Sequence, residues 1–331
     1  MSTVDFDKLF ANFSTIKVGV IGDVMLDVYW WGHVDRISPE APVPVVALDK
    51  KEHRIGGAGN VALNLAALGA NVSVLTVMGA DDNGANLTEL FKEQHINTAW
   101  LLLQPSRITT TKTRIISRNQ QMLRLDAEIT KELSADDENA LLAKVQQYIE
   151  SQQPQVIIFE DYNKGVLTER VIKGITALCK QHGVITTVDP KRKNFFSYQG
   201  VDIFKPNLKE VKDGLNLLIE EVNLHTLDDI HQQLQDKLNH QISFITLSEK
   251  GVFYQNDKVS KIIPSHLRNI SDVSGAGDTV IAVASLIYAA TKRVDLMAEV
   301  ANIAGGLVCE DVGTVAVNKE RLLQECKLLL K

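Results

Sequence analysis

Short β-branched runs alternate with longer segments of helical periodicity along most of this 331-residue chain. This alternation is typical of a mainly parallel sheet with helices on both faces, because a helix returns the chain to begin each new parallel strand. We therefore expect an α/β fold. The expected strands are 18–21, 72–77, 156–159, 185–188, 203–204 and 242–247, and the expected helices are 60–68, 83–93, 136–150, 168–180, 227–238, 277–290 and 295–308.

Two segments depart from the alternation. Residues 29–48 carry three prolines before a strand-like stretch, and residues 109–125 form two extended runs around Arg118-Asn119-Gln120. Neither segment contains a helical pattern, which predicts a small antiparallel sheet that acts as a lid over a site. The chain has no internal repeat or clear linker. We expect one domain over residues 1–331, with lid segments at about 29–48 and 108–126.

Composition and charge restrict the expected partners. A hydrophobic content of 45% supports a large core, and a formal charge of −6 argues against a general binder of nucleic acids or membrane surfaces. An anionic ligand should therefore be small and held by local Lys and Arg clusters. The N-terminus lacks a signal-peptide pattern, and the cysteines are widely spaced without a Cys-x-x-Cys pair, so we expect a reduced, cytoplasmic protein.

The segment Asp272-Val273-Ser274-Gly275-Ala276-Gly277-Asp278 places a small-residue turn at the start of a long apolar helix. The N–H groups of Gly275, Ala276 and Gly277 would be unpaired there and uncovered by side chains, which suits a phosphate. Asp278 would lie in the first turn, where the helix dipole favours an ionised carboxylate that can accept a proton. The pattern favours phosphoryl transfer, although a Gly-rich turn also precedes helices that bind no phosphate.

A second glycine motif, Gly57-Ala58-Gly59-Asn60-Val61-Ala62, matches a dinucleotide-binding fingerprint, and acidic residues follow at 81–82. The charged segment 49–54 that leads into it argues against this interpretation, because the fingerprint requires an apolar strand there. A close approach of residues 56–60 to a polyhydroxylated ligand is the better interpretation. The Asn60 amide offers both a donor and an acceptor to sugar hydroxyls.

Other polar residues have both a functional and a structural interpretation. Asp23 and Asp27 follow the first strand, where they could accept from sugar hydroxyls or form turns. Asn207 and Glu210 form a capping-box pattern that could also hold magnesium through its waters. Basic residues cluster in the second lid segment and after Asp189-Pro190. Lys112 and Arg114 alternate along an extended run and would form a clamp for a phosphate on the substrate.

Together the two glycine motifs resemble the paired signatures of the ribokinase-like (PfkB) carbohydrate kinases. Within that family, the chain is most similar to the D-glycero-β-D-manno-heptose 7-phosphate kinases, the kinase domain of ADP-heptose synthesis proteins that serve lipopolysaccharide biosynthesis. The likeness extends from about residue 16 to residue 317. It rests on Val20-Ile21-Gly22-Asp23-Val24-Met25-Leu26-Asp27, Arg36-Ile37-Ser38-Pro39-Glu40-Ala41-Pro42-Val43-Pro44-Val45, Ser117-Arg118-Asn119-Gln120-Gln121 and Asp161-Tyr162-Asn163-Lys164-Gly165.

The resemblance implies a ribokinase-like three-layer sandwich that transfers phosphate from ATP to the anomeric hydroxyl of heptose 7-phosphate. It implies that Asp278 is the base and that Gly275, Ala276 and Gly277 hold the transferred group. Residues implied at ATP are Asn207, Leu208, Lys209, Glu210, Thr246, Gly251, Asp272 and Asn302. Residues implied at the sugar phosphate are Asp23, Asp27, Gly56, Gly57, Asn60, Lys112, Arg114, Arg118, Asp161, Lys164 and Lys191.

The implied cofactors are ATP and Mg²⁺, with Glu210 reaching the metal through water, and a monovalent cation is a further expected ligand. We also expect a homodimer. The chain has no His-x-Gly-His motif, so no nucleotidyltransferase domain is expected. Another PfkB-type sugar or nucleoside kinase and a non-catalytic nucleotide or sugar sensor remain alternatives, and intact Asp278 argues against the sensor.

Overall fold

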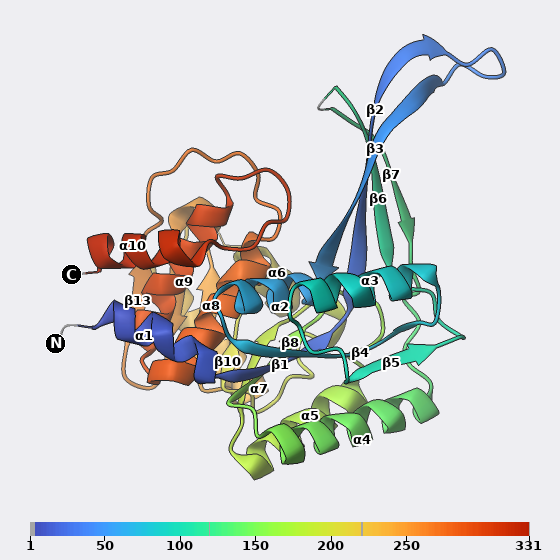
Figure 1. Cartoon of the computed structure of the whole chain (residues 1–331). Helices are drawn as coiled ribbons and strands as arrows, with labels where there is room; N and C mark the ends of the chain where they lie inside the picture. The colour runs from blue at the N-terminus through green and yellow to red at the C-terminus, as the bar shows by residue number, and fades with distance from the viewer. Residues whose placement is uncertain (1–3, 119, 220, 331) are drawn as a thin grey trace.

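The computed structural model describes residues 4–118, 120–219 and 221–330 (Figure 1). Asn119, in the expected lid turn, lies outside these residues. Within them the larger sheet has nine strands. Neighbouring strands are parallel except at one end of the sheet, where each of the two outermost strands is antiparallel to the strand before it. In spatial order the strands are β13 (Ser260–Ile263), β12 (Val252–Gln255), β11 (Ile242–Thr246), β10 (Ile203–Phe204), β9 (Ile185–Asp189), β8 (Val156–Glu160), β1 (Lys17–Gly22), β4 (Asn71–Gly79) and β5 (Leu101–Gln104).

Helices cover both faces of this sheet, which confirms the expected three-layer α/β fold. Alternate side chains of β8 divide the core, because Val156 and Ile158 join one apolar cluster whereas Ile157 and Phe159 join the other. The first face carries α1 (Phe6–Asn12), α2 (Ala58–Ala67), α3 (Asp82–Glu93), α8 (Ala276–Thr291), α9 (Val294–Val308) and α10 (Lys319–Leu329). The second carries α4 (Ala135–Gln152), α5 (Glu169–His182), α6 (Leu208–Leu215) and α7 (Leu224–Leu238).

All the strands predicted for the main sheet are present, but three others were not predicted. Strands β5, β12 and β13 have only four residues each, and β5 and β13 lie at the sheet edges, where partial burial weakens the apolar pattern. Helix α7 begins three residues before its predicted start. Its N-cap is Asn223, whose side chain accepts from the N–H of Thr226.

The smaller sheet projects from the body of the molecule (Figure 1). It is longer than the two expected lid segments, because residues 49–54 continue a strand despite their charge. This strand belongs to the small sheet and is antiparallel to its neighbour, so the dinucleotide fingerprint at residues 57–62 lacks the parallel strand that it requires. In spatial order its strands are β3 (Pro44–Gly57), β2 (Val24–Ile37), β6 (Thr111–Ser117) and β7 (Gln120–Ala127).

The pairing of strands in the small sheet determines which side chains lie on each of its two faces. Asp27 pairs with Arg54 on one neighbouring strand, and Tyr29 pairs with Arg114 on the other, so these polar side chains share a face. That face points to the main body, because a Cβ added to Gly313 would lie 2.6 Å from Arg54 Nη1. The described part of the chain has no helix with the length and apolar character needed to cross a bilayer.

Candidate active site

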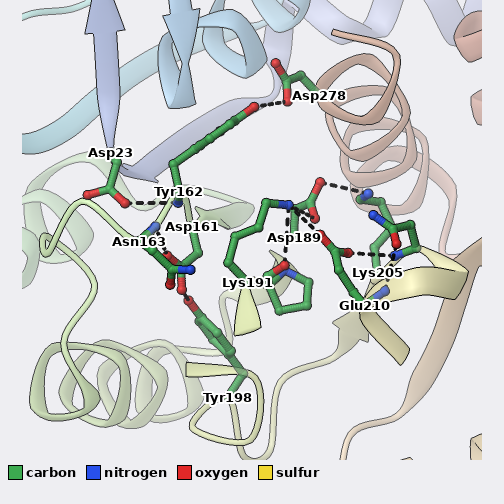
Figure 2. Close-up of polar contacts among 12 residues, drawn as sticks. Asp23, Asp161, Tyr162, Asn163, Asp189, Lys191, Tyr198, Lys205, Glu210 and Asp278 are labelled. Carbon is green, nitrogen blue, oxygen red and sulfur yellow. Dashed lines mark hydrogen bonds and ion pairs between the residues drawn. The ribbon is translucent and has the colours of Figure 1, made fainter. Parts of the chain in front are cut away.

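Asp278 lies in the first turn of α8 and is buried, with 6% of its surface exposed. Its two carboxylate oxygens have separate donors. Asn60 Nδ2 donates to Oδ2 at 2.8 Å. The Tyr162 hydroxyl donates to Oδ1 at 2.7 Å, as Figure 2 shows. Burial raises the pKa of Asp278 to about 6, although both hydrogen bonds lower it. At neutral pH the group is therefore mostly ionised and close to the pKa that suits a general base.

The turn before Asp278 requires a glycine at the position immediately before the first residue of α8. Gly275 is the N-cap of α8 with φ +77°, and an added Cβ would lie 2.8 Å from Asn60 Nδ2. The N–H of Ala276 makes a long bond of 3.3 Å to the Val273 carbonyl. A Cβ on Gly277 would lie 3.7 Å from Asp189 Oδ2. The turn thus places its backbone against both Asn60 and the charged residues of the neighbouring strands.

A row of ionisable residues stands at the carboxyl ends of adjacent strands, beside the start of α8. Glu160 ends β8 in register with Asp189 at the end of β9, and Lys205 directly follows β10. Lys205 Nζ lies 2.8 Å from Asp189 Oδ2. Neither carboxyl oxygen of Glu160 has a hydrogen-bond partner among the described residues. Burial and the nearby carboxylates raise the pKa of Glu160 well above its ordinary value.

Glu160, Tyr162 and Lys205 were not predicted as site residues from the sequence. The available signal was positional: each lies within two residues of the carboxyl end of a buried strand, where ligands of open α/β sheets bind. Asp189 carries the same signal and has its pKa lowered, because Lys191 and Lys205 stabilise the charged form against burial.

The residues expected at the nucleotide surround the start of α6. Asn207 and Glu210 form a complete capping box, in which each side chain accepts from the other residue's N–H. Lys191 Nζ lies 2.7 Å from Glu210 Oε1 and 3.5 Å from Asp189 Oδ1 (Figure 2). Thr246, at the end of β11, forms a parallel bridge with Asn207. Leu208 and Lys209 are the first residues of the helix.

Three further nucleotide candidates make local contacts. Asp272 accepts from both the N–H and the hydroxyl of Ser274, and its other oxygen accepts from the Gly313 N–H at 2.9 Å. Asn302 donates its amide to the Pro264 carbonyl at 2.9 Å. The Gly251 carbonyl accepts from the Leu247 N–H at 2.8 Å and closes the turn between β11 and β12.

The residues expected at the sugar meet where the small sheet joins α2. Arg114 Nη1 lies 2.5 Å from Asp27 Oδ1. A Cβ on Gly56 would lie 2.4 Å from Asp27 Oδ2. Gly57 caps α2, which carries Asn60 to Asp278.

Tyr29 lies between two guanidinium groups on the same face of the small sheet. The central carbons of Arg54 and Arg114 are 4.7 and 5.1 Å from the ring centroid of Tyr29. Arg54 was not predicted. Its signal in the sequence was the charged segment 49–54, which counts against a dinucleotide site but also carries this arginine.

Two expected sugar ligands are saturated by a loop. Asp23 accepts backbone N–H groups from Tyr162, Lys164 and Val166 at 3.0 to 3.1 Å. Asp161 accepts from the Asn163 N–H and, at 2.8 Å, from the Tyr198 hydroxyl. In this structure both carboxylates hold residues 161–166 in place.

The remaining basic candidates differ in position. Lys112 is in register with Asp27 and shares its face of the small sheet. Arg118 lies at the turn after β6, with 76% of its side chain exposed, 3.5 Å from Asp35. Lys164 Nζ lies 2.6 Å from Glu128 Oε2. The structure therefore groups Lys112 with Arg114 and leaves Arg118 at the lid tip.

The fold and the site define a class of enzyme: an α/β phosphotransferase with a buried carboxylate at a glycine-rich helix start, beneath a β-sheet lid. The sequence matches the pfkB family carbohydrate kinases over residues 15–321. The chain belongs to this family and is a sugar kinase.

Two of the curated relatives are bifunctional proteins named HldE. Bifunctional protein HldE of Sulfurimonas denitrificans is 38% identical over 311 residues, which cover 94% of this chain and 64% of that protein. Bifunctional protein HldE of Geobacter sulfurreducens is 37% identical over 325 residues, which cover 98% and 65%. The chain thus spans just under two thirds of the length of these relatives.

Solved structures share the fold at low identity. Phosphofructokinase-2 from Escherichia coli in complex with potassium has a TM-score of 0.78 at 16% identity, with 96% of this chain and 99% of that chain covered. Arabidopsis thaliana ribokinase complexed with ribose and ATP has a TM-score of 0.71 at 16% identity, with 93% and 98% covered.

Proposed function

We propose that this kinase transfers the γ-phosphoryl group of ATP to the anomeric hydroxyl of D-glycero-D-manno-heptose 7-phosphate and forms the 1,7-bisphosphate of ADP-heptose synthesis. The observation that carries the proposal is the buried Asp278 carboxylate in the first turn of α8, held through both oxygens. The similarity to the kinase-containing HldE proteins supports this choice of sugar.

In the proposed reaction, Asp278 accepts the proton of the anomeric hydroxyl as the sugar oxygen bonds to phosphorus and the nucleotide oxygen leaves. The first-turn N–H groups near Gly275 and Gly277 would stabilise charge on the transferred group. Because phosphoryl transfer has a loose transition state, positioning and charge stabilisation contribute most of the catalysis.

The lid face supports a phosphorylated substrate. Arg54 and Arg114 converge on Tyr29, and a guanidinium pair can bind a phosphate through several N–H groups. Arg114 also fixes Asp27, which would accept from sugar hydroxyls. We therefore propose that this face, with Lys112, binds the distal phosphate.

We propose ATP with Mg²⁺ as the donor, bound near Asn207, Glu210, Thr246, Gly251, Asp272 and Asn302. No cluster of three metal-binding side chains occurs in residues 4–118, 120–219 and 221–330. This fits magnesium held mainly by phosphate oxygens and water, which needs only one or two carboxylates. Glu210 is the carboxylate that would contact its water shell. The monovalent cation remains a prediction.

A substrate screen tests the proposed function. Purified protein with MgATP is assayed on heptose 7-phosphate, fructose 6-phosphate, ribose and adenosine, and the product is identified by mass spectrometry. We expect heptose 7-phosphate to have the highest kcat/KM. Asp278→Asn should lower kcat by about 10²- to 10⁴-fold, with KM for ATP changed only a few-fold.

Preference for an unphosphorylated sugar or nucleoside would reject heptose 7-phosphate and favour another kinase of the family. A wild-type protein that binds nucleotide but transfers no phosphate to any acceptor would favour the sensor alternative. Full turnover by Asp278→Asn would remove the proposed base.

A further inference from the structure

The hydroxyl of Tyr162 contacts the carboxylate that the proposed mechanism uses as its base. Tyr162 comes two residues after β8 and extends to Asp278 at the start of α8, where its O–H donates to Oδ1 at 2.7 Å (Figure 2). We propose that Tyr162 is a positioning residue, which orients the Asp278 carboxylate and favours its ionised form; this rests on the proposed role of Asp278. Asn60 holds the other oxygen, so the two donors together fix the plane of the carboxylate.

The loop that carries Tyr162 is held before any substrate binds. Asp23 accepts the N–H groups of Tyr162, Lys164 and Val166, and Asp161 accepts the N–H of Asn163 at 2.8 Å. These bonds fix the backbone on both sides of Tyr162. Its hydroxyl is thus a preorganised donor, and Asp23 supports the base through the loop.

The surroundings of Asp278 explain why such a donor matters. Burial and the nearby carboxylate of Asp189 raise the pKa of Asp278, whereas Lys205 and the donors Asn60 and Tyr162 lower it. Glu160 also faces this group from β8, and Lys191 stands beyond Asp189. Without the Tyr162 donor, the balance moves toward the protonated carboxyl, which cannot accept a proton.

Tyr162 itself remains a donor throughout the working pH range. Burial and the neighbouring carboxylate of Asp278 raise the pKa of its hydroxyl well above the ordinary value. The phenol therefore keeps its proton, and the sugar hydroxyl delivers the transferred proton to Asp278 alone. Oδ1 has a second lone pair that remains available for the sugar hydroxyl.

The test is the pH dependence of kcat/KM for Tyr162→Phe, with MgATP and the sugar preferred in the substrate screen. The acid limb is the fall of kcat/KM at low pH, where Asp278 becomes protonated. Removal of the O–H should move this limb to a pH about one unit higher than in the wild type, since each hydrogen bond to a carboxylate lowers its pKa by about that much. At a pH well above the limb, kcat should remain within about tenfold of wild type.

Tyr198→Phe is the matched control. This variant also removes a buried hydroxyl, but that hydroxyl donates to Asp161 at 2.8 Å and does not contact Asp278. The acid limb of Tyr198→Phe should therefore coincide with that of the wild type. An unchanged limb in Tyr162→Phe, with or without a loss of kcat, would overturn the proposal. Equal shifts in both variants would do the same.

Incorporation of 3-fluorotyrosine at position 162 keeps the side chain and its packing nearly unchanged. The fluorine makes the phenol a stronger donor, so the limb should move to lower pH, opposite to Tyr162→Phe. An upward shift would contradict the proposal. This single-atom change also decides the question if Tyr162→Phe does not fold.

Carbon-13 NMR of labelled aspartate, assigned with Asp278→Asn, measures the same titration without any substrate. The Asp278 signal should titrate near pH 6 in the wild type and at lower pH with 3-fluorotyrosine. This readout separates the two proposals, because the shift persists even if the substrate screen rejects heptose 7-phosphate. Loss of the shift with normal heptose kinase activity would reject only the role of Tyr162.

Discussion

At the scale of single residues, Glu160 is the least expected feature of the site. Its side chain is fully buried at the end of β8, and neither carboxyl oxygen finds a donor in the described structure. Asp189 and Asp278 are its charged neighbours. An ionised carboxylate would be unfavourable in this position, and burial together with the Asp189 and Asp278 carboxylates raises the pKa of Glu160 well above its ordinary value.

Glu160→Gln should therefore become more stable than the wild type as pH rises. The folded state holds the Glu160 proton more tightly than the unfolded state, whose pKa is about 4.3. The contribution of this proton to the stability of the wild type is present in full below that pH. It is lost as the pH rises from there to the raised folded-state pKa. Glutamine does not titrate, so the difference in unfolding free energy should grow by about 1.4 kcal/mol per pH unit. Urea unfolding at pH 5, 6, 7 and 8 measures this.

Glu93→Gln, at an exposed position near the end of α3, is the control and should show no such trend. A difference between Glu160→Gln and wild type that is constant from pH 5 to pH 8 would mean that Glu160 is not held protonated in the folded protein.

Residues such as Glu160 and Tyr162 show what the sequence could not predict. The glycine motif before Asp278 predicted the start of α8, because turn chemistry is local. Asn60 was predicted only as a sugar ligand, and its contact with Asp278 joins residues far apart in the sequence. The contact between Tyr162 and Asp278 depends on the pairing of strands and on a loop held by Asp23, all of which are distant in sequence. Asp23 has the residue type of a sugar ligand, but its three N–H donors are visible only in the fold.

At the scale of elements, the start of α8 is built around a residue without a side chain. Gly275→Ala should lower kcat by at least tenfold, because its Cβ would displace the Asn60 amide that holds Asp278. It should also destabilise the protein by more than the roughly 1–2 kcal/mol of a left-handed alanine. Steady-state kinetics and urea unfolding measure the two effects.

Gly183→Ala is the matched control at the end of α5. Gly183 has a similar left-handed φ of +68°, but an added Cβ meets nothing within 4 Å. This variant should show the backbone strain alone and keep wild-type kcat. Equal kcat losses in the two variants would show that strain, rather than displacement of Asn60, explains the effect.

At the scale of the whole molecule, the small sheet presents two faces of opposite character. One carries Asp27, Arg54 and Arg114 toward the main body, and the other carries Leu123 in register with Ile115. Leu123 and its alternate neighbour Leu125 are 51% and 49% exposed. An apolar face on a projecting sheet favours contact with another protein surface, and we propose that a second copy of this chain covers it.

Leu123→Lys should therefore shift a dimer toward monomer. A buried, unpaired lysine on each copy would oppose association, and a loss of about 3 kcal/mol would weaken the dimer more than 100-fold. Sedimentation velocity over a range of concentrations measures this. Leu103→Lys is the control, because Leu103 is also 51% exposed but lies on β5, at the edge of the main sheet. A wild-type protein that is monomeric at all concentrations, or a Leu123→Lys dimer as stable as that of Leu103→Lys, would contradict assembly through the lid.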